Sequence, residues 1–433
     1  MGGKNVIIAQ SGGPSPVINN TLRGIIESCR NYPGKFGHLY GGWHGIEGVL
    51  KEELLDLSSQ SRVEIDLLRT TPAAGSIGTC RYKLRDHQHL DFKRIIEVFR
   101  AHDIGYFFYI GGNDSQHTAL KVSQECASSG IEIISVGVPK TIDNDIGDND
   151  FSLIDHTPGY GSVARYWAHM IKTINEENMG SSPADPVIVL QAMGRSIGYI
   201  PAAARLADPH RELPLQIYLA ESGITIEGMT DNVNDCVKKY GRCMLVVSEG
   251  FDVGNSGEAL DAFGHTEYGA SRMSVQQTIV NHLNDSGILD RGSVRGQIPG
   301  TDQRHAMIFA SDTDLEEAFL VGQKAVDIAL NDGNGWMATI LRNPGPGYSV
   351  RFDKVPLDKV ALSERTFPLH WIAASGIDVT DDFISYALPL IGNAWINIPL
   401  EDGLPRFTRF EKKFAVKKLK PFTPQAYSEQ VKK

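Results

Sequence analysis

The chain has 433 residues, 41% of them hydrophobic and 22% charged, which is typical of a globular protein long enough for two packed domains. Its formal net charge of −10 disfavours nucleic acid or an anionic membrane as the main partner. No stretch approaches the roughly 20 apolar residues that cross a bilayer, and the N-terminus lacks a signal-peptide pattern, so the expected compartment is the cytoplasm. The five cysteines form no Cys-x-x-Cys pair and predict reduced thiols.

Short apolar runs alternate with segments of helical period, which predicts an α/β protein with mostly parallel sheets covered on both faces. The first unit is a strand at residues 6–9, a glycine loop, and a helix that places Leu22, Ile25 and Cys29 on one face. The basic segment at residues 406–433 is interpreted as a solvated helix and frayed tail. Further strands are expected at residues 106–110, 131–138, 187–190, 244–247 and 337–341.

Several of these strands end in loops that carry glycines and polar side chains, and open parallel sheets bind ligands at the carboxyl ends of their strands. Gly12 and Gly13 precede the first helix, where free amide groups favour a phosphate, although a Gly-Gly pair alone is also typical of a tight turn. Asn113 and Asp114 follow the strand at residues 106–110. Their oxygen atoms suit Mg²⁺, and the alternative is that Asp114 or Ser115 is simply a helix N-cap.

The loop at residues 139–145 (Pro-Lys-Thr-Ile-Asp-Asn-Asp) brings one cation and several polar oxygens together. In phosphoryl transfer a carboxylate accepts the proton of the attacking hydroxyl, while cations offset the charge on the transferred group. The loop therefore favours phosphoryl-transfer chemistry, although an Asp-Asn-Asp cluster alone is also compatible with a turn.

The order of these loops and of later motifs resembles the phosphofructokinase family across most of the chain. The last matching segment runs from an arginine, through a glycine, to Gln-Arg, and guanidinium groups suit a sugar phosphate because they donate two parallel hydrogen bonds. The matching segments are residues 75–81, 139–145, 193–195, 248–250 and 295–304.

The resemblance implies two Rossmann-like three-layer domains with the active site in the cleft between them. It implies a phosphoryl-donor-binding domain at residues 1–155 plus about 304–360, and a sugar-phosphate-binding domain at residues 156–303 plus about 361–433. It also implies fructose 6-phosphate as the acceptor, Mg²⁺ as the cofactor, and a homodimer or homotetramer.

Residue roles follow from the resemblance at the matching positions. Asp143 is expected to act as general base on the 1-hydroxyl, with Lys140 and Asp114 completing the catalytic group. Asn113 is expected to associate with magnesium, and Arg295 to reach a neighbouring subunit's site. The other expected contacts to the two substrates are Gly12, Gly13, Arg81, Thr141, Ile142, Asp145, Met193, Gly194, Arg195, Glu249, Thr301 and Arg304.

Departures from the ATP-dependent members favour pyrophosphate as the donor. Those members usually have Gly-Gly-Asp-Gly where residues 111–114 are Gly-Gly-Asn-Asp, and glycine where Lys140 stands. The carboxylate of Asp114 is expected to repel the α-phosphate of a nucleotide, and Lys140 to compensate the charge of a diphosphate. The amide of Asn113 is a weaker ligand than a carboxylate, so Mg²⁺ is expected to be held largely by pyrophosphate. Thr301 replaces a common histidine.

The predicted reaction is a reversible, Mg²⁺-dependent transfer from pyrophosphate to fructose 6-phosphate, giving fructose 1,6-bisphosphate and phosphate, within glycolysis and gluconeogenesis. Three alternatives stay open: an ATP-dependent 6-phosphofructokinase, a non-catalytic regulatory subunit, and a dinucleotide-dependent oxidoreductase. The last rests on residues 159–164 (Gly-Tyr-Gly-Ser-Val-Ala), which fit a G-x-G-x-x-A fingerprint but follow no clear strand. The presence of Asp143 and Lys140 argues against a non-catalytic subunit.

Overall fold

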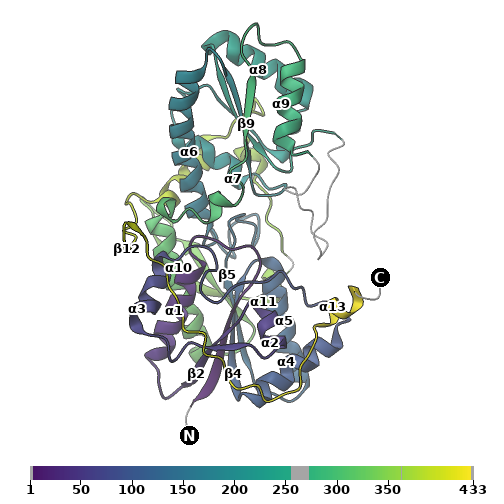
Figure 1. Ribbon diagram of the computed structural model, residues 1–433, viewed down its shortest axis with the longest axis vertical. Coiled ribbons are helices and arrows are strands. Elements are labelled where there is room, and N and C mark those ends of the chain that lie inside the picture. The colour runs from purple at the N-terminus through teal and green to yellow at the C-terminus, as the bar shows by residue number, and fades with distance from the viewer. Residues whose placement is uncertain (1–2, 255–272, 362, 431–433) are drawn as a thin grey trace.

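The computed structural model describes residues 3–254, 273–361 and 363–430, which form two α/β units stacked end to end (Figure 1). Both sheets are built from apolar segments that follow the predicted alternation of strands and helices. The predicted α/β class with mostly parallel sheets is confirmed, as is a strand at each of the six predicted places.

Within the described residues, the first unit contains a seven-stranded sheet in the order β11-β10-β5-β4-β1-β2-β3. Neighbouring strands are parallel except at the two edges, where β10 pairs with β11 and β2 pairs with β3 in antiparallel fashion. The strands are β1 (Lys4–Gln10), β2 (Phe36–Gly42), β3 (Leu54–Asp56), β4 (Ile104–Gly111), β5 (Ile134–Pro139), β10 (Trp336–Arg342) and β11 (Val350–Pro356).

Helices cover both faces of this sheet, because successive side chains of each buried strand point to opposite sides. Val6 and Ile8 of β1 pack with α1 (Ile18–Arg30) and α10 (Asp312–Asn331) in one core cluster. Ile7 and Ala9 pack with α4 (His89–Ala101) and α5 (Asn113–Ser128) in another. The remaining helices of this unit are α2 (Ile46–Leu50), α3 (Arg62–Leu67), α11 (Leu357–Val360) and α13 (Gln425–Gln430).

The second unit, at the top of Figure 1, contains a fully parallel sheet in the order β7-β8-β6-β9. Within the described residues, no helix combines the length and apolar character that crossing a bilayer requires. The strands are β6 (Val187–Ala192), β7 (Leu215–Tyr218), β8 (Cys243–Ser248) and β9 (Val294–Gln297). The helices are α6 (Tyr160–Ser181), α7 (Tyr199–Ala202), α8 (Ile226–Tyr240), α9 (Val275–Asp285) and α12 (Asp381–Ala387), and a hairpin β12 (Leu400–Glu401) and β13 (Leu404–Pro405) follows.

The C-terminal segment differs from the prediction. Residues 406–424 contain no helix and run extended along the first unit, in yellow in Figure 1, before α13 begins. Leu419 and Phe422 pack against the core of the first sheet, and buried Glu52 accepts hydrogen bonds from the backbone amides of Lys418 (2.6 Å) and Leu419 (3.1 Å). The predicted helix is therefore wrong for residues 406–424, and within the described part of this segment only residues 425–430 are helical. The expected domain division also placed this segment in the sugar-phosphate-binding domain, whereas its apolar side chains pack against the first unit.

A buried ion-pair cluster ties the connection between the two units to α10. His156 lies between Asp155 (Nδ1 to Oδ2, 2.8 Å) and Glu317 (Nε2 to Oε2, 2.6 Å). Arg342 pairs with Asp155 at 3.0 Å, and the hydroxyl of Tyr348 donates to Glu317. Burial lowers the pKa of His156, but the two carboxylates outweigh it and raise that pKa to about 9.

This cluster predicts a pH-dependent stability. Because the folded pKa lies above the unfolded value of about 6.5, the stabilisation is fully present below that value and is lost as the pH rises through about 9. Urea denaturation should show the stability difference between wild type and His156→Gln shrinking from pH ~7 to pH ~9.5, by at most about 1.4 kcal/mol per pH unit. A difference that stays constant over this range would contradict a charged imidazole.

Candidate active site

A cavity of about 610 Å³ lies between the two units. Its lining comes from the loops that follow β1, β4 and β5 in the first sheet and β6, β8 and β9 in the second. Residues 81–83 and 363–364 complete it. The chain continues from β1 to β2 on one side, whereas β4 lies on the other side of β1, so the strand order changes direction at this pair. Open α/β sheets bind ligands at such positions.

The structure brings nearly all of the predicted site residues together around this cavity. Gly194 lies beside the lining, where its amide donates to Oε1 of Glu249 at 3.1 Å. Arg295 points elsewhere: its side chain is 66% exposed and its Nε pairs with Asp185 at 2.8 Å. The predicted residues that line the cavity are Gly12, Gly13, Arg81, Asn113, Asp114, Lys140, Thr141, Ile142, Asp143, Asp145, Met193, Arg195, Glu249, Thr301 and Arg304.

Three cationic side chains converge on the glycine loop after β1. A Cβ atom at Gly13 would lie 2.9 Å from Nη1 of Arg304 and 4.0 Å from Nη2 of Arg81, and one at Gly12 would lie 3.5 Å from Nζ of Lys140. Gly12 also has a φ of +78°, which side chains rarely adopt. The glycines therefore leave open the space between the cations, and Lys140 donates to the carbonyl oxygen of Gly13 at 2.5 Å.

The charges in this cluster oppose one another. Burial lowers the pKa of Lys140 to about 8; Asp143 and Asp145 oppose that shift, while Arg304 and Arg81 add to it. The pKa of Arg304 is likewise lowered, first by burial and then by Arg81. A bound anion would relieve this repulsion, so the cluster favours a ligand with phosphate-like charge.

The loop after β5 presents two carboxylates with different surroundings. The side chain of Asp145 is 5% exposed, against 20% for Asp143. Arg195 pairs with Asp145 and lies 3.4 Å from Asp143. Burial and then the charge of Asp143 raise the pKa of Asp145 to about 6, although Arg195 opposes that shift. Asp143 is thus the more accessible acceptor for a proton, and its amide is held by the hydroxyl of Thr141 at 3.1 Å.

The second sheet contributes a carboxylate fixed by backbone amides. Glu249, directly after β8, accepts hydrogen bonds from the amides of Gly194 (3.1 Å) and Arg195 (2.9 Å). Burial raises its pKa to about 6. Beside it, Oε1 of Gln303 accepts from the indole of Trp167 (2.9 Å) and from the amide of Met193 (3.2 Å). These bonds attach the loop after β6 to Glu249 and Gln303.

Two buried oxygen atoms fit a divalent cation. Within the described residues, Oδ1 of Asn113 and Oδ1 of Asp145 have no hydrogen-bond partner, although both are buried beside the cavity. Across residues 3–254, 273–361 and 363–430, no group of three or more His, Cys, Asp or Glu side chains is placed to hold a metal ion. Mg²⁺ is commonly bound by one or two protein oxygens together with substrate phosphates, and these two residues fit that pattern.

Asp114 forms an ion pair with a residue that the sequence did not single out. Its Oδ2 pairs with Nζ of Lys83 at 2.8 Å, whereas Lys140 is buried against Gly13. Lys83 and Tyr82 line the cavity but were missed by the sequence analysis. The sequence contained a signal for them, because Tyr82 and Lys83 come directly after Arg81 and Lys83 adds a second cation to the same segment.

The dinucleotide fingerprint at residues 159–164 forms the start of α6 and not a ligand loop. The amides of Gly159 and Ser162 donate to the buried carboxylate of Asp314 at 2.9 Å and 2.8 Å. A Cβ atom at Gly161 would lie 2.6 Å from the carbonyl oxygen of Leu390, so this glycine serves close packing. The amides that would bind a dinucleotide phosphate are therefore already occupied.

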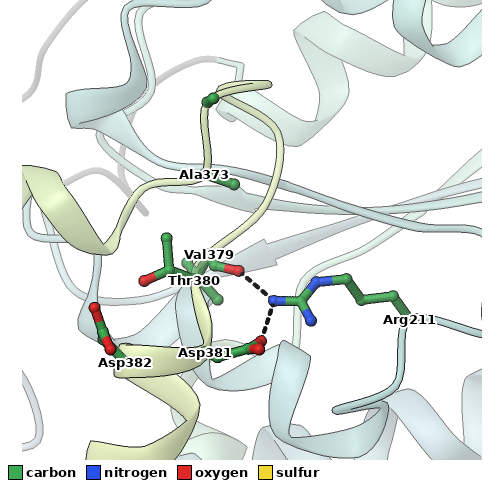
Figure 2. Close-up of a pocket in the computed structure, with 7 residues that line it drawn as sticks. Arg211, Ala373, Val379, Thr380, Asp381 and Asp382 are labelled. Carbon is green, nitrogen blue, oxygen red and sulfur yellow. Dashed lines mark hydrogen bonds and ion pairs between the residues drawn. The ribbon is translucent and has the colours of Figure 1, made fainter.

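A second hollow lies in the second unit, between Arg211 and the loop before α12. Figure 2 shows Arg211 reaching the turn that bears Val379 and Asp381. Arg211 donates to the carbonyl oxygen of Val379 at 2.9 Å and pairs with Asp381 at 2.8 Å and Asp378 at 3.3 Å. These contacts anchor the loop, and we assign this hollow no chemistry.

Comparison with known proteins decides the family. The sequence profile described as "Phosphofructokinase" matches residues 5–329. The chain belongs to the phosphofructokinase family. It is 38% identical to the pyrophosphate--fructose 6-phosphate 1-phosphotransferase of Halomonas elongata, over 96% of this chain and 99% of that protein. The resemblance seen in the sequence is thereby confirmed.

Solved structures of the phosphofructokinase family agree. The pyrophosphate-dependent phosphofructokinase of Nitrosospira multiformis superposes with a TM-score of 0.87 at 37% identity, covering 97% of this chain and 100% of that one. An ATP-dependent 6-phosphofructokinase of Amycolatopsis methanolica is more distant, at 26% identity over 65% of this chain and 60% of that protein. The chain is thus more similar to these two proteins named for pyrophosphate than to this ATP-dependent one.

Proposed function

We propose that this phosphofructokinase-family protein is a cytoplasmic enzyme that transfers a phosphoryl group from pyrophosphate to the 1-hydroxyl of fructose 6-phosphate. The observation that carries the donor is the full-length similarity to enzymes named pyrophosphate--fructose 6-phosphate 1-phosphotransferase. The carboxylate of Asp114 lies at the cavity wall, paired with Lys83, and we expect it to oppose the α-phosphate of a nucleotide. The cysteines in the described chain are buried free thiols, which is compatible with a reducing compartment.

In this proposal Asp143 accepts the proton of the 1-hydroxyl. The hydroxyl oxygen then forms a bond to the nearer phosphorus of pyrophosphate, the bridging P–O bond breaks, and phosphate leaves with the bridging oxygen. The partial exposure of Asp143, against the deeper burial of Asp145, supports this assignment. Arg195, bound to both carboxylates, positions the pair.

The donor is proposed to lie on the first unit. Lys140 and Arg81 would bind its phosphate oxygens beside Gly12, where the glycine loop leaves space. Asn113 and Asp145 would hold Mg²⁺, and the ion would neutralise part of the phosphate charge when bound. Because an anion favours the protonated amine, binding of pyrophosphate should hold Lys140 in its charged form.

The acceptor is proposed to lie on the second unit. Glu249 would accept hydrogen bonds from sugar hydroxyls, and Met193 and Gly194 would shape the wall beside it. Arg195, Thr301 and Arg304 would complete the binding of the sugar phosphate, since guanidinium groups bind phosphate through paired hydrogen bonds. These roles are supported by the positions of the side chains, because all of these residues except Gly194 line the cavity.

The reaction can be followed directly by ³¹P NMR with purified protein, pyrophosphate, fructose 6-phosphate and Mg²⁺. We expect the pyrophosphate signal to be replaced by phosphate and a new phosphate monoester in equal amounts, and the reverse reaction to regenerate pyrophosphate. An unchanged pyrophosphate signal under these conditions would refute the proposal.

Arg295 is proposed to act on the site of a neighbouring subunit, and the protein to form a homodimer or homotetramer. Its position outside the cavity of its own chain supports this role. Neither Arg295→Ala nor Asp143→Asn should be active alone. Co-expressed as a dimer, the two inactive variants should recover roughly a quarter of wild-type activity, because half of the molecules are hybrids with one intact site. No recovery would mean that Arg295 does not act across an interface.

A further inference from the structure

The segment that carries Arg81 is bound on one side to the glycine loop. The amide of Gly12 donates to the carbonyl oxygen of Cys80 at 2.8 Å, and the hydroxyl of Thr79 donates to the carbonyl oxygen of Gly12 at 2.8 Å. Ser11 and Cys80 form an isolated parallel β-bridge. The segment therefore lies directly against the loop at which the donor phosphates are proposed to bind.

On its other side, the same segment is bound to the C-terminal helix α13. Tyr82 is 3% exposed, and its hydroxyl donates to Oδ2 of Asp91 at 2.5 Å while accepting from the amide of Ala426 at 3.1 Å. The amide of Gln425 donates to Oδ1 of the same carboxylate at 2.9 Å. The ring of Tyr427 packs edge-on against Tyr82 with centroids 5.6 Å apart. Residues 425–427 thus contact Tyr82 and its partner Asp91 through two backbone amides and one aromatic ring.

Tyr82 lies between two cations of the cavity. Arg81 and Lys83 both line it, and Lys83 pairs there with Asp114 at 2.8 Å. Burial and then Asp91 raise the pKa of Tyr82, which keeps the phenol protonated as a donor to that carboxylate. A shift of the ring would move the backbone from which both cations extend.

We propose that residues 425–427 are a positioning element of the donor site, acting through Tyr82 to hold Arg81 and Lys83 toward the phosphoryl donor. The identity of that donor rests on the proposed function. The chain that leads to these residues runs along the first unit (Figure 1). On this path the backbone amides of Lys418 and Leu419 donate to buried Glu52. Fixing these cations before the ligand arrives reduces the ordering that binding requires.

Two single substitutions test the proposal. Ala426→Pro removes the amide hydrogen that Tyr82 accepts, in the first turn of a helix, where proline is tolerated. Tyr82→Phe keeps the ring and removes the hydroxyl. Each should raise the KM for pyrophosphate roughly three- to tenfold, with kcat and the KM for fructose 6-phosphate within about twofold. Val416→Pro is the matched control. Val416 lies in the extended chain before α13, and its side chain is 82% exposed.

The readout separates positioning from a merely structural role. A lower Tm with an unchanged KM for the donor, or equal changes in both KM values, would overturn the proposal. Wild-type protein that used ATP and not pyrophosphate would refute the proposed function instead, and the same split would then be measured with ATP, since Arg81 and Lys83 would still face its phosphates.

Discussion

Asp143→Asn should lower kcat by roughly 10²–10⁴ while leaving the affinity for fructose 6-phosphate similar, because an amide cannot accept the proton of the attacking hydroxyl. The contacts of Arg195 indicate that this substitution should affect turnover without disturbing the loop. Arg195 keeps its contact with Asp145 when the charge of Asp143 is removed, so the surrounding loop should hold its conformation. Steady-state kinetics together with calorimetric binding of the sugar phosphate measure both quantities.

Asp148→Asn is the matched control for this change. It makes the same substitution in the same connection, but Asp148 accepts hydrogen bonds from Ser152 (3.0 Å) and Leu153 (2.8 Å) and lies outside the cavity lining. We expect it to lower the Tm and to leave kcat nearly unchanged. Near-normal turnover in Asp143→Asn would remove Asp143 from the role of base.

Changing Asp114 and Lys140 together to glycine should raise kcat/KM for ATP relative to pyrophosphate. Two unit charges about 4 Å apart interact by about 1 kcal/mol in water and about 4 kcal/mol at an effective dielectric of 20. Asp114 is 54% exposed, so the lower part of that range applies and the ratio should move by roughly five- to thirtyfold. Removing Lys140 should add to this by weakening the binding of the diphosphate.

A neighbouring acid–cation pair supplies the control. Asp86 and Lys121 pair at 3.0 Å outside the cavity lining, and Lys121 lies in the same helix as Asp114. Changing both to glycine should cost similar helix stability without altering donor preference. If the Asp114 and Lys140 variant shows no movement of the ATP-to-pyrophosphate ratio, donor selectivity lies in other residues.

The sequence predicted the central strands because each is a short apolar run, and it missed the strands that lack this feature. β2 (Phe36–Gly42) contains three glycines, β9 (Val294–Gln297) exposes most of its side chains, and β7 (Leu215–Tyr218) is only four residues long. The charges of residues 406–424 suggested a solvated segment. Ala415, Leu419 and Phe422 recur at helical spacing, but the segment runs extended because the folded first unit supplies the surface that they cover.

The location of most candidate site residues was predictable because they follow β1, β4, β5, β6 and β8, whose carboxyl ends meet. The pairing within the site was not. Asp114 pairs with Lys83, whereas Lys140 donates to the carbonyl oxygen of Gly13, and both contacts depend on how distant loops pack. The hydroxyl of Tyr82 accepts a hydrogen bond from Ala426, which is 344 residues away in the sequence, so no local pattern could predict the contact.

The most direct test of the account is a comparison of kcat/KM for pyrophosphate and for ATP, using purified protein with saturating fructose 6-phosphate and Mg²⁺. We predict efficient turnover with pyrophosphate and little or none with ATP. Turnover with ATP that equals or exceeds turnover with pyrophosphate would contradict the account.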